Sequence, residues 1–440
     1  MGSQCADSGH TRQGERDECM ITRPREINKI MTKLTNSGYD VYCAGQCVMA
    51  SYLGDKPLDW DLYTDCPQAK IRELFPEGEP IGSRVTRLDY SEEIISDDIN
   101  IADSVEGIIA DIVTLEGSIQ DQLAVYDLTA EAVAEHPQKP VVDLYSGRDD
   151  IKSLILKPTA NAEALIIKDP IRILKAVKYV ALYNFDLHKD LYELLLSSAD
   201  RLPEADRDDI LYEFTETING RYAGKALKMI VGLNMLPAIV GKEAAVVSRR
   251  GAQDYETLAD NIDKIKQIPL RRLALFYLCF GRNCRTAVEY LPHEEQDREY
   301  LTDAETQINK LHFLSTEESL KNYIYHNGWD KYNFMDKLSK AQAIVYDLNT
   351  TRIEGRNYIL DTVMREKQPI FIEDLAIDAD DIIEAGITDD QQRAEYLLSL
   401  LPDVIHQKPG NNERKALLSY AKKFNKSKFR VAFRDVKWLR

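Results

Sequence analysis

Hydrophobic positions follow two different periods along this chain. Between Arg23 and Thr114, short alternating stretches of polar and apolar residues lie among short helical ones, which is typical of a mixed α/β region. From Pro170 onward, apolar residues recur at the spacing of an α-helix, without a fixed repeat period. The pattern predicts a sheet-containing head joined to a long helical remainder. Its clearest later helical windows are residues 270–280, 332–348 and 389–401.

The head is predicted to begin with a helix over residues 26–35, because Ile27, Ile30 and Leu34 share one helical face. The turn-forming residues 36–38 end this helix. The acidic, turn-rich residues 91–106 are expected to form a mobile loop between the last two strands of the head. The expected strands span residues 39–43, 58–63, 84–89 and 108–115, and a second helix is expected over residues 47–53.

Length and composition indicate a globular protein of two to four domains. The 440 residues exceed what one compact core holds, and the apolar share of 44% and charged share of 29% are ordinary. No run of about eighteen apolar residues occurs, so no membrane-spanning helix is predicted. The first twenty residues lack the apolar segment of a secretory signal and are expected to form a polar arm. The seven cysteines, at irregular spacings, favour reduced, buried thiols in a cytoplasmic protein.

The charge of the chain is uneven. The formal net charge of −17 opposes a uniformly basic nucleic-acid-binding surface, although binding depends on local charge. Residues 413–440 carry ten Lys and Arg residues against only Glu413 and Asp435. A solvated terminal tail explains this composition, and an RNA-contacting element is the alternative because aromatic residues are interleaved with the basic ones. These aromatic residues are Phe424, Phe429, Phe433 and Trp438.

Asp59 and Asp61 flank Trp60 in the expected strand 58–63. Side chains two residues apart on a strand project to the same face, so the two carboxylates are expected to lie together. A cation between them relieves their repulsion, and hard oxygen ligands suit Mg²⁺. In phosphoryl transfer such a pair holds ions that activate the attacking oxygen and neutralise the leaving pyrophosphate. Exposed acids on edge strands also produce this pattern, so its context decides its meaning.

That context resembles a known family. Residues 39–48, 52–54 and 59–61 are similar to the signature of the polymerase-β-like nucleotidyltransferases. The similarity is closest to the class II tRNA nucleotidyltransferases, or CCA-adding enzymes, and the bacterial poly(A) polymerases. Residues 143–152 and 168–179 resemble two further family blocks, D-P-F-G-G-x-x-D-L and E-D-P-x-R-x-L-R-A-x-R-F, in order and spacing. Similarities at residues 208–214, 232–237 and 375–387 extend the resemblance over nearly all of the chain after residue 22.

This resemblance implies a fold and an order of domains. The fold class is α+β, with a polymerase-β-like nucleotidyltransferase head that contains a small mixed sheet. An elongated all-α neck, body and tail are expected to follow the head. The implied domains are a polar arm (1–22), the head (23–157), a neck that reads the nucleotide base (158–245), a helical body (246–368) and a helical tail with a basic end (369–440).

The resemblance also assigns roles to single residues. Asp59 and Asp61 would hold the metal, and Asp111 would complete the catalytic group as a third strand carboxylate. For Asp111 the alternative, an acid near a strand end without a catalytic role, stays open. Gly45, in the turn after the first strand, and Asp127 would take part in nucleotide binding.

Asp169, Arg172 and Lys175 recur at a spacing of three, which places them on one face of an expected helix. Because Pro170 follows it, Asp169 is also a good candidate for a helix N-cap. A carboxylate that accepts from an exocyclic amino group, beside a guanidinium that donates to a ring nitrogen, fits both cytosine and adenine. Guanine and uracil present a carbonyl oxygen at that place, so ATP and CTP are the predicted substrates without a template.

The sequence departs from the family at its cationic positions. Residues 44–50 lack the Arg of the G-G-x-V-R-D block, and residues 125–132 lack both arginines of the R-R-D-F-T-x-N-A block. In the family these arginines resemble triphosphate and ribose contacts, where charge-assisted hydrogen bonds are strongest. We expect Lys168, Lys175 and Lys178 to carry more of the phosphate charge in this chain.

The sequence leaves two functions open. The first is an enzyme that adds CMP, AMP or both to an RNA 3′ end, with tRNA as the implied RNA, Mg²⁺ as cofactor and ATP and CTP as substrates. The second is a diverged homologue with lost or redirected catalysis, either an RNA-binding module or a nucleotidyltransferase with a non-RNA acceptor. The retained Asp59, Asp61, Asp169 and Arg172 favour the enzyme. Sequence patterns determine neither the added nucleotides nor the oligomeric state.

Overall fold

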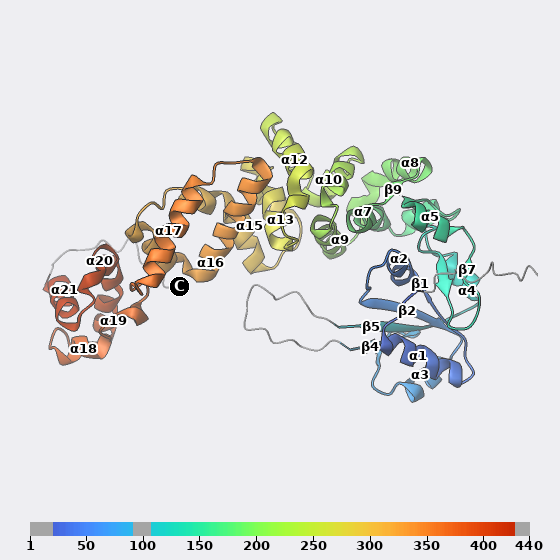
Figure 1. The fold of residues 1–440 in the computed structure, drawn as a ribbon, viewed down its shortest axis with the longest axis horizontal. Coiled ribbons are helices and arrows are strands. Elements are labelled where there is room, and N and C mark those ends of the chain that lie inside the picture. Colours follow the sequence, from blue (N-terminus) through green and yellow to red (C-terminus); the bar gives the residue numbers. More distant parts are fainter. Residues whose placement is uncertain (1–20, 91–106, 427–440) are drawn as a thin grey trace, which may run out of the picture. The chain divides into compact units, whose positions relative to one another are not determined.

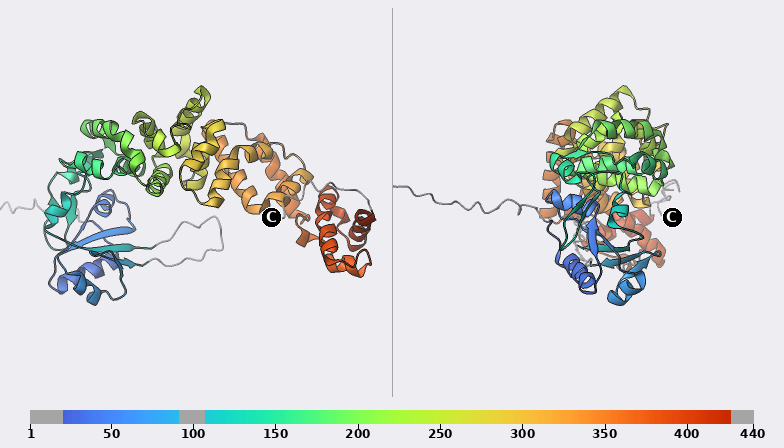
Figure 2. Two further views of the ribbon diagram at one scale, coloured as in Figure 1. Left: turned by 180° about the vertical axis from the view of Figure 1, so that it is seen from behind. Right: turned by 90° about the vertical axis from the view of Figure 1, so that its right-hand side faces the viewer.

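The computed structural model describes residues 21–90 and 107–426, and the chain forms two compact units, Met1–Lys242 and Glu243–Arg440 (Figures 1 and 2). Most of the expected N-terminal arm, the expected loop at 91–106 and the basic, aromatic end after residue 426 lie outside the described residues. The boundaries of the five expected domains stay predictions.

Within the described part of the first unit, seven strands form one mixed sheet in the order β3-β4-β5-β2-β1-β6-β7. β2 and β5 run parallel, whereas the other neighbouring strands are antiparallel. The four predicted strands correspond to β1, β2, β4 and β5. The strands are Val41–Ala44 (β1), Asp59–Thr64 (β2), Glu79–Ile81 (β3), Val85–Asp89 (β4), Ile109–Thr114 (β5), Val133–Glu135 (β6) and Val142–Asp143 (β7).

Helices cover both faces of this sheet. α1 (Arg25–Asn36) and α3 (Gln68–Leu74) lie on one face, and α2 (Gln46–Tyr52) lies on the other (Figure 1). The predicted apolar face of α1 is buried, including Ile27 and Leu34. Burial of each such aliphatic side chain contributes roughly 1.5–3 kcal/mol, which fixes the helix on the sheet.

The helical part of the first unit centres on α7 (Arg172–Tyr183), which packs against α9 (Arg207–Asn219) and α10 (Ala223–Gly232). The predicted unbroken helical pattern after Pro170 is interrupted by the two-residue strand β9 (Asp186–Leu187), which pairs in parallel with β8 (Ile155–Leu156). The other helices are α4 (Ile119–Leu123), α5 (Gly147–Ser153), α6 (Ala162–Lys168), α8 (Lys189–Ser198) and α11 (Leu236–Val240).

The described part of the second unit is helical. Its longest helix, α16 (Glu317–Tyr346), contains a non-helical glycine, Gly328, with φ 78° and ψ 164°. None of the described helices is both long enough and apolar enough to span a lipid bilayer. The remaining helices are α12 (Arg249–Asn261), α13 (Pro269–Leu278), α14 (Cys284–Tyr290), α15 (Glu295–Leu311), α17 (Thr351–Arg365), α18 (Ala379–Glu384), α19 (Gln391–Ser399), α20 (Leu401–Gln407) and α21 (Arg414–Lys426).

The cysteines in the described residues are buried and free, as predicted. Burial raises the pKa of the Cys43 thiol to about 12, which keeps it protonated and unreactive at neutral pH. Cys43 and Cys47 each contact a backbone carbonyl and behave as core side chains. The five described cysteines are Cys43, Cys47, Cys66, Cys279 and Cys284.

Candidate active site

Three strands of the sheet align a row of charged residues on one face. Asp59 and Asp61 alternate with the buried Trp60 along β2, so their side chains share a face. In the β2–β5 register Asp61 stands opposite Asp111, and in the β4–β5 register Asp111 stands opposite Arg87. The structure therefore brings the three predicted carboxylates together and adds a cation that was not predicted from the sequence.

Burial and mutual repulsion disfavour the charged forms of the two β2 carboxylates. The pKa of Asp61 is raised to about 6, first by burial and then by the charges of Asp111 and Asp59. The pKa of Asp59 is also raised, mainly by burial, while Arg87 lowers it. Burial is thus the largest cause of both shifts, and for Asp61 the two neighbouring carboxylates add to it.

Arg87 holds Asp111 in a bidentate ion pair. Its Nε and Nη2 donate to the two carboxylate oxygens at 2.8 Å each. The hydrogen bonds to Asp111 raise the pKa of Arg87, so its guanidinium stays charged. Asp111 is therefore already neutralised by a partner, unlike the β2 pair.

The chemistry of Asp59 and Asp61 fits a divalent cation. Both supply hard oxygen ligands from one strand face, and a bound cation would favour their charged forms, which burial disfavours. Within residues 21–90 and 107–426, no group of three or more His, Cys, Asp or Glu side chains is arranged as a metal site. The candidate donor set is thus the β2 pair, and Asp111 is committed to Arg87.

Gly45 forms the turn between β1 and α2, and only glycine fits there. Its φ of 84° and ψ of −147° lie in a region that is essentially restricted to glycine. A Cβ atom at this position would lie 2.7 Å from the Tyr126 hydroxyl oxygen. That hydroxyl lies 3.1 Å from the Tyr63 hydroxyl, so the turn packs directly on a buried tyrosine pair beside Asp61.

Arg172, at the start of α7, connects two of the predicted nucleotide-binding acids. Its Nη1 donates to Asp127 Oδ1 at 2.5 Å, and its Nε lies 3.3 Å from Asp169 Oδ2. The alternative interpretation of Asp169 as the N-cap of this helix is not observed. Asp169 follows α6, and the residue that caps α7, Ile171, has no side-chain capping bond. Arg172 and the two acids therefore form a chain of ion pairs at the start of α7, and Asp169 lies outside the helix.

The two lysines of α7 have different surroundings. Lys178 is buried, and its Nζ pairs with Glu213 Oε2 of α9 at 2.8 Å. Lys175 is half-buried and, among the described residues, makes no ion pair within 4.0 Å. Of these two predicted phosphate contacts, Lys175 is the one whose charge is available to a ligand. Lys168, the third lysine predicted to carry phosphate charge, is exposed at the end of α6.

Glu131 and Tyr179 belong to the same region, and neither was predicted from the sequence. The Tyr179 hydroxyl donates to Glu131 Oε1 at 2.5 Å. Burial and the charge of Asp127 raise the pKa of Glu131. Glu131 occupies the place of the Asn in the family block R-R-D-F-T-x-N-A, which is the only sequence signal that pointed to it.

The acids of β2 and the cations of α7 share one electrostatic environment. The charge of Lys175 lowers the pKa of Asp61, and the charge of Lys178 lowers the pKa of Asp59. The predicted catalytic and nucleotide-binding residues, which are separated by more than one hundred residues in sequence, therefore lie around one site within the first unit.

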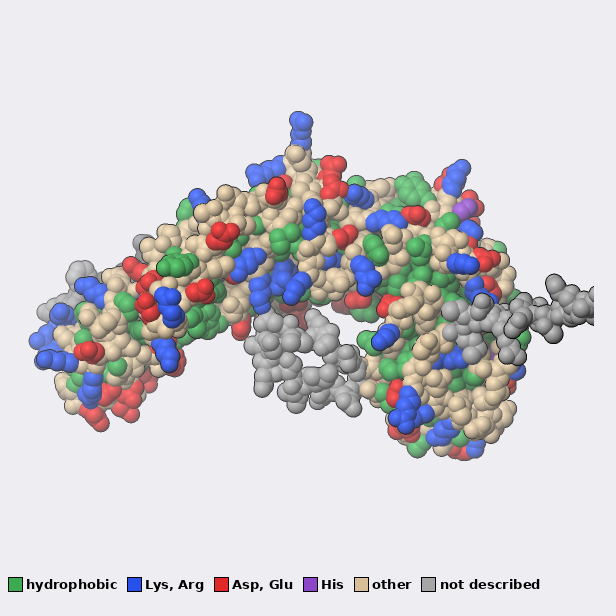
Figure 3. All heavy atoms as spheres, viewed as in Figure 1, with side chains coloured by type: hydrophobic (Ala, Val, Ile, Leu, Met, Phe, Trp, Pro, Cys, Tyr) green, Lys and Arg blue, Asp and Glu red, His purple; other side chains and the backbone are tan. Residues whose placement is uncertain are grey.

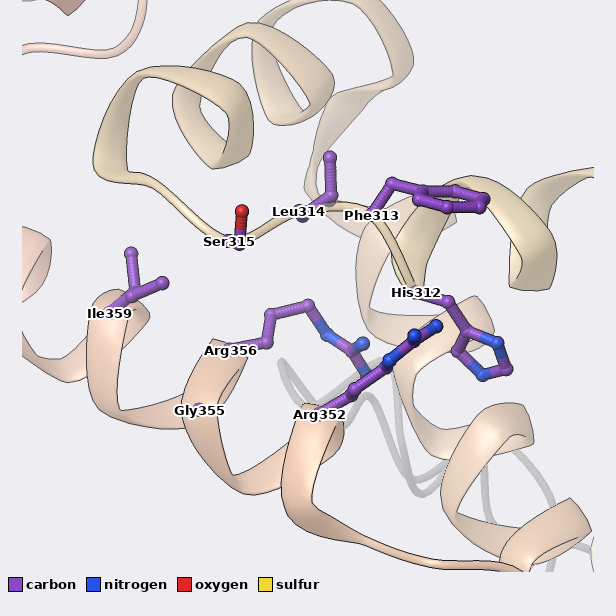
Figure 4. A pocket seen from close by; sticks show the side chains of 8 residues that line it. All are labelled: His312, Phe313, Leu314, Ser315, Arg352, Gly355, Arg356 and Ile359. Carbon is purple, nitrogen blue, oxygen red and sulfur yellow. The ribbon is translucent and has the colours of Figure 1, made fainter.

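The second unit has a separate, cationic pocket of about 360 Å³ between the α15–α16 connection and α17 (Figure 4). His312, Arg352 and Arg356 converge there. Arg356 is fully buried and is bound by Asp336 at 2.6 Å, so this guanidinium mainly joins α16 to α17. On the face of the molecule shown in Figure 3, Lys and Arg side chains are interspersed with Asp and Glu.

The mixed sheet and the helices that follow it form an α+β protein, and comparisons with known proteins agree with this fold. No family model matches the sequence. The chain is 26% identical over 227 residues to the CCA-adding enzyme of Geobacillus stearothermophilus, which covers 50% of this chain and 56% of that protein. It is 24% identical over 213 residues to the CC-adding tRNA nucleotidyltransferase of Halalkalibacterium halodurans, with 48% and 53% covered. The chain thus spans little more than half the length of these curated relatives.

Solved structures resemble the chain over a longer range. The CCA-adding enzyme of Bacillus stearothermophilus in complex with CTP has a TM-score of 0.73 at 17% identity, covering 92% of this chain and 98% of that one. The Thermotoga maritima CCA-adding enzyme complexed with tRNA has a TM-score of 0.61 at 15% identity, with 92% and 97% covered. The predicted fold class and the resemblance to class II tRNA nucleotidyltransferases are confirmed.

Proposed function

We propose that this protein is a template-independent nucleotidyltransferase that adds CMP, AMP or both to an RNA 3′ end, with tRNA as the acceptor. The observation that carries this proposal is the Asp59–Asp61 pair, which faces the cations of α7. The relatives that share the fold include a CCA-adding enzyme solved with CTP and one solved with tRNA, which supports these substrates. A cytoplasmic location stays a prediction.

Asp59 and Asp61 would hold the divalent cation, for which we propose Mg²⁺. Such an ion, when bound, neutralises charge on the triphosphate and activates the attacking hydroxyl oxygen. The side chains of this chain then have to position the nucleotide. Lys175 is the available cation for the phosphates, and the glycine at position 45 lets the backbone of the β1–α2 turn approach them closely.

Arg172 and Asp169 would select the base, because their guanidinium and carboxylate offer one donor and one acceptor side by side. Asp127 fixes the Arg172 guanidinium from the other side. Lys178 closes an ion pair with Glu213, and we propose that it holds α7 against α9. This arrangement prefers cytosine and adenine, by about 1–3 kcal/mol for a good paired contact.

In the proposed reaction, the 3′-hydroxyl oxygen of the acceptor attacks the α-phosphorus of the nucleoside triphosphate. The bond between this phosphorus and the oxygen that bridges to the β-phosphate breaks, and pyrophosphate leaves with the electron pair. The hydroxyl proton is released to solvent. The acceptor gains one nucleotide, and its new 3′-hydroxyl is ready for the next addition.

Incubation with labelled ATP or CTP, Mg²⁺ and a tRNA that lacks its 3′ CCA tests the proposal. We expect incorporation by the wild-type protein, and we expect the separate variants Asp59→Ala and Asp61→Ala to lose it by at least a hundredfold while circular dichroism stays unchanged. Asp65→Ala, on the surface directly after β2, is the matched control. If the wild-type protein binds tRNA but incorporates nothing, the protein is an RNA-binding module and the enzymatic proposal is wrong.

A further inference from the structure

The Arg87–Asp111 pair lies at the end of the row of charged residues, and the function proposed above does not use it. Its bidentate contact uses two of the five N–H groups of the guanidinium. The Arg87 side chain is 41% exposed and that of Asp111 is 21% exposed. One edge of a fixed, charged guanidinium is therefore open to a ligand beside the candidate active site.

The strand order determines on which side of the acids this cation lies. β2 stands between β1 and β5, and β4 follows β5. Gly45 directly follows β1, and the segment that holds Asp127 leads into β6, which is the other neighbour of β1. The proposed nucleotide contacts therefore lie on the β1 side of the acids. Arg87 lies two strands away on the opposite side, roughly 10 Å from the backbone of Asp61 at the usual strand spacing.

The geometry of the reaction assigns the two sides to different substrates. In nucleotidyl transfer the attacking oxygen and the leaving pyrophosphate are roughly in line, on opposite sides of the α-phosphorus. If the triphosphate is held on the β1 side, the acceptor hydroxyl has to approach from the side of β5 and β4. A polynucleotide that presents its terminal 3′-hydroxyl on the side of β5 and β4 also brings its last phosphodiester there, because this phosphodiester lies only one nucleotide from the hydroxyl.

We propose that Arg87, oriented by Asp111, binds the 3′-terminal phosphodiester of the acceptor strand. This inference rests on the nucleotidyltransferase function proposed above and deepens it by naming the acceptor contact. Asp111 is then a positioning residue that aims Arg87. A planar guanidinium fits a phosphate better than an ammonium does, because it donates two parallel hydrogen bonds. The acceptor is accordingly a polynucleotide, and a small alcohol or a protein hydroxyl lacks the group that Arg87 recognises.

If Arg87 and Asp111 formed only a structural ion pair, their replacement would affect the stability of the fold and not the binding of RNA. Exposed ion pairs contribute little to stability, so loss of the Arg87–Asp111 contact should scarcely change the unfolding midpoint. Arg84 provides a matched control, because it lies just before β4, pairs with Glu116 at 3.0 Å and is 49% exposed. Arg84→Gln thus removes an ion pair beside the start of β4 without touching the row of acids.

Steady-state incorporation tests the assignment in the full chain. For Arg87→Gln we expect the KM for the RNA acceptor to rise at least tenfold, with the KM for the nucleoside triphosphate within twofold of wild type. Arg87→Lys should recover part of the loss, and Asp111→Asn should raise the same KM by a smaller factor. Arg84→Gln should leave both constants unchanged. A rise in the nucleotide KM instead would place Arg87 on the triphosphate and overturn the proposal.

Equilibrium binding gives a readout that does not depend on turnover. The probe is a fluorescent RNA 3′ end, bound in EDTA so that no turnover occurs. A dinucleoside monophosphate should displace this probe from the wild-type protein more strongly than a nucleoside does. This difference between the two competitors should disappear in Arg87→Gln. An unchanged difference would refute the proposed contact even if Arg87→Gln were inactive. If the wild-type protein incorporated no nucleotide, the proposed enzymatic function would fail, and this competition would still decide whether Arg87 binds the phosphodiester.

Discussion

The carboxylates in the row of charged residues on β2 and β5 differ in how their charge is balanced. Asp111 has Arg87 as a bidentate partner, whereas the pKa of Asp61 is raised to about 6 by burial and by neighbouring carboxylates. An acid with a raised pKa in the folded state destabilises the fold when it ionises. A cation bound beside Asp61 would offset this cost.

Replacement of Asp61 by Asn should therefore stabilise the protein in EDTA at pH 8. The folded pKa of about 6 lies above the ordinary value of 3.8, so the unfavourable contribution of ionised Asp61 develops as pH rises between these values. We expect a gain of about 1–3 kcal/mol at pH 8 and a smaller gain at pH 4.5, measured by urea denaturation. Divalent cations should stabilise wild type and not this variant. A loss of stability at pH 8 would contradict the assignment.

Arg172 should determine the choice of nucleotide. Arg172→Ala leaves the buried Asp127 without its partner, so part of its effect would be a loss of stability. Arg172→Lys keeps the positive charge but loses the planar guanidinium with its paired donors. We expect this variant to reduce the preference for ATP and CTP over GTP and UTP by about tenfold, with little loss of stability. The measurement is kcat/KM for each nucleotide. An unchanged preference in Arg172→Lys and in Arg172→Ala would refute base selection by this residue.

At the scale of elements, the β1–α2 turn connects the sheet to the site. The turn combines a backbone conformation restricted to glycine with a close contact to the Tyr126 hydroxyl. These two features can be separated experimentally, because Gly54 has a similar φ of 79° and open space around it. The turn thus offers an internal comparison between strained backbone and steric overlap.

Gly45→Ala should destabilise the protein by about 2–4 kcal/mol, because the backbone strain costs about 1–3 kcal/mol and the tyrosine pair has to move. Gly54→Ala should cost only the backbone strain. Urea denaturation of both variants measures the difference. Equal losses would show that Tyr126 moves away without cost.

Sequence patterns located the longer elements of the head and left the shortest ones out. The expected strand 58–63 is β2 at Asp59–Thr64, and the expected helix 26–35 is α1 at Arg25–Asn36. β6 and β7 span three and two residues, which is too short for a period to be recognised. The alternation in β2 was sufficient to place Asp59 and Asp61 on one face. The Arg87–Asp111 pair needs the register between two strands, which composition and spacing do not specify.

At the scale of the whole molecule, the fold agrees with CCA-adding enzymes over 92% of the chain, although identity with the solved structures is only 17% and 15%. The net charge of −17 gave no information about the placement of cations, because Figure 3 shows both signs interspersed on the face in view. The missing family arginines were visible in the sequence, and Lys168, Lys175 and Lys178 were predicted to replace them. The ion pair of Lys178 with Glu213 and the place of Arg87 beside the acids depend on the fold, so neither could be predicted from a motif.

The parallel pairing of β2 with β5 has a consequence for synthesis. Asp61 and Asp111 face each other although fifty residues separate them along the chain, and Arg172 comes later still. While the ribosome is still producing the first hundred residues, the growing polypeptide cannot contain this arrangement. A head that ends before α7 therefore contains the paired acids of β2 but lacks Arg172, Lys175 and Lys178.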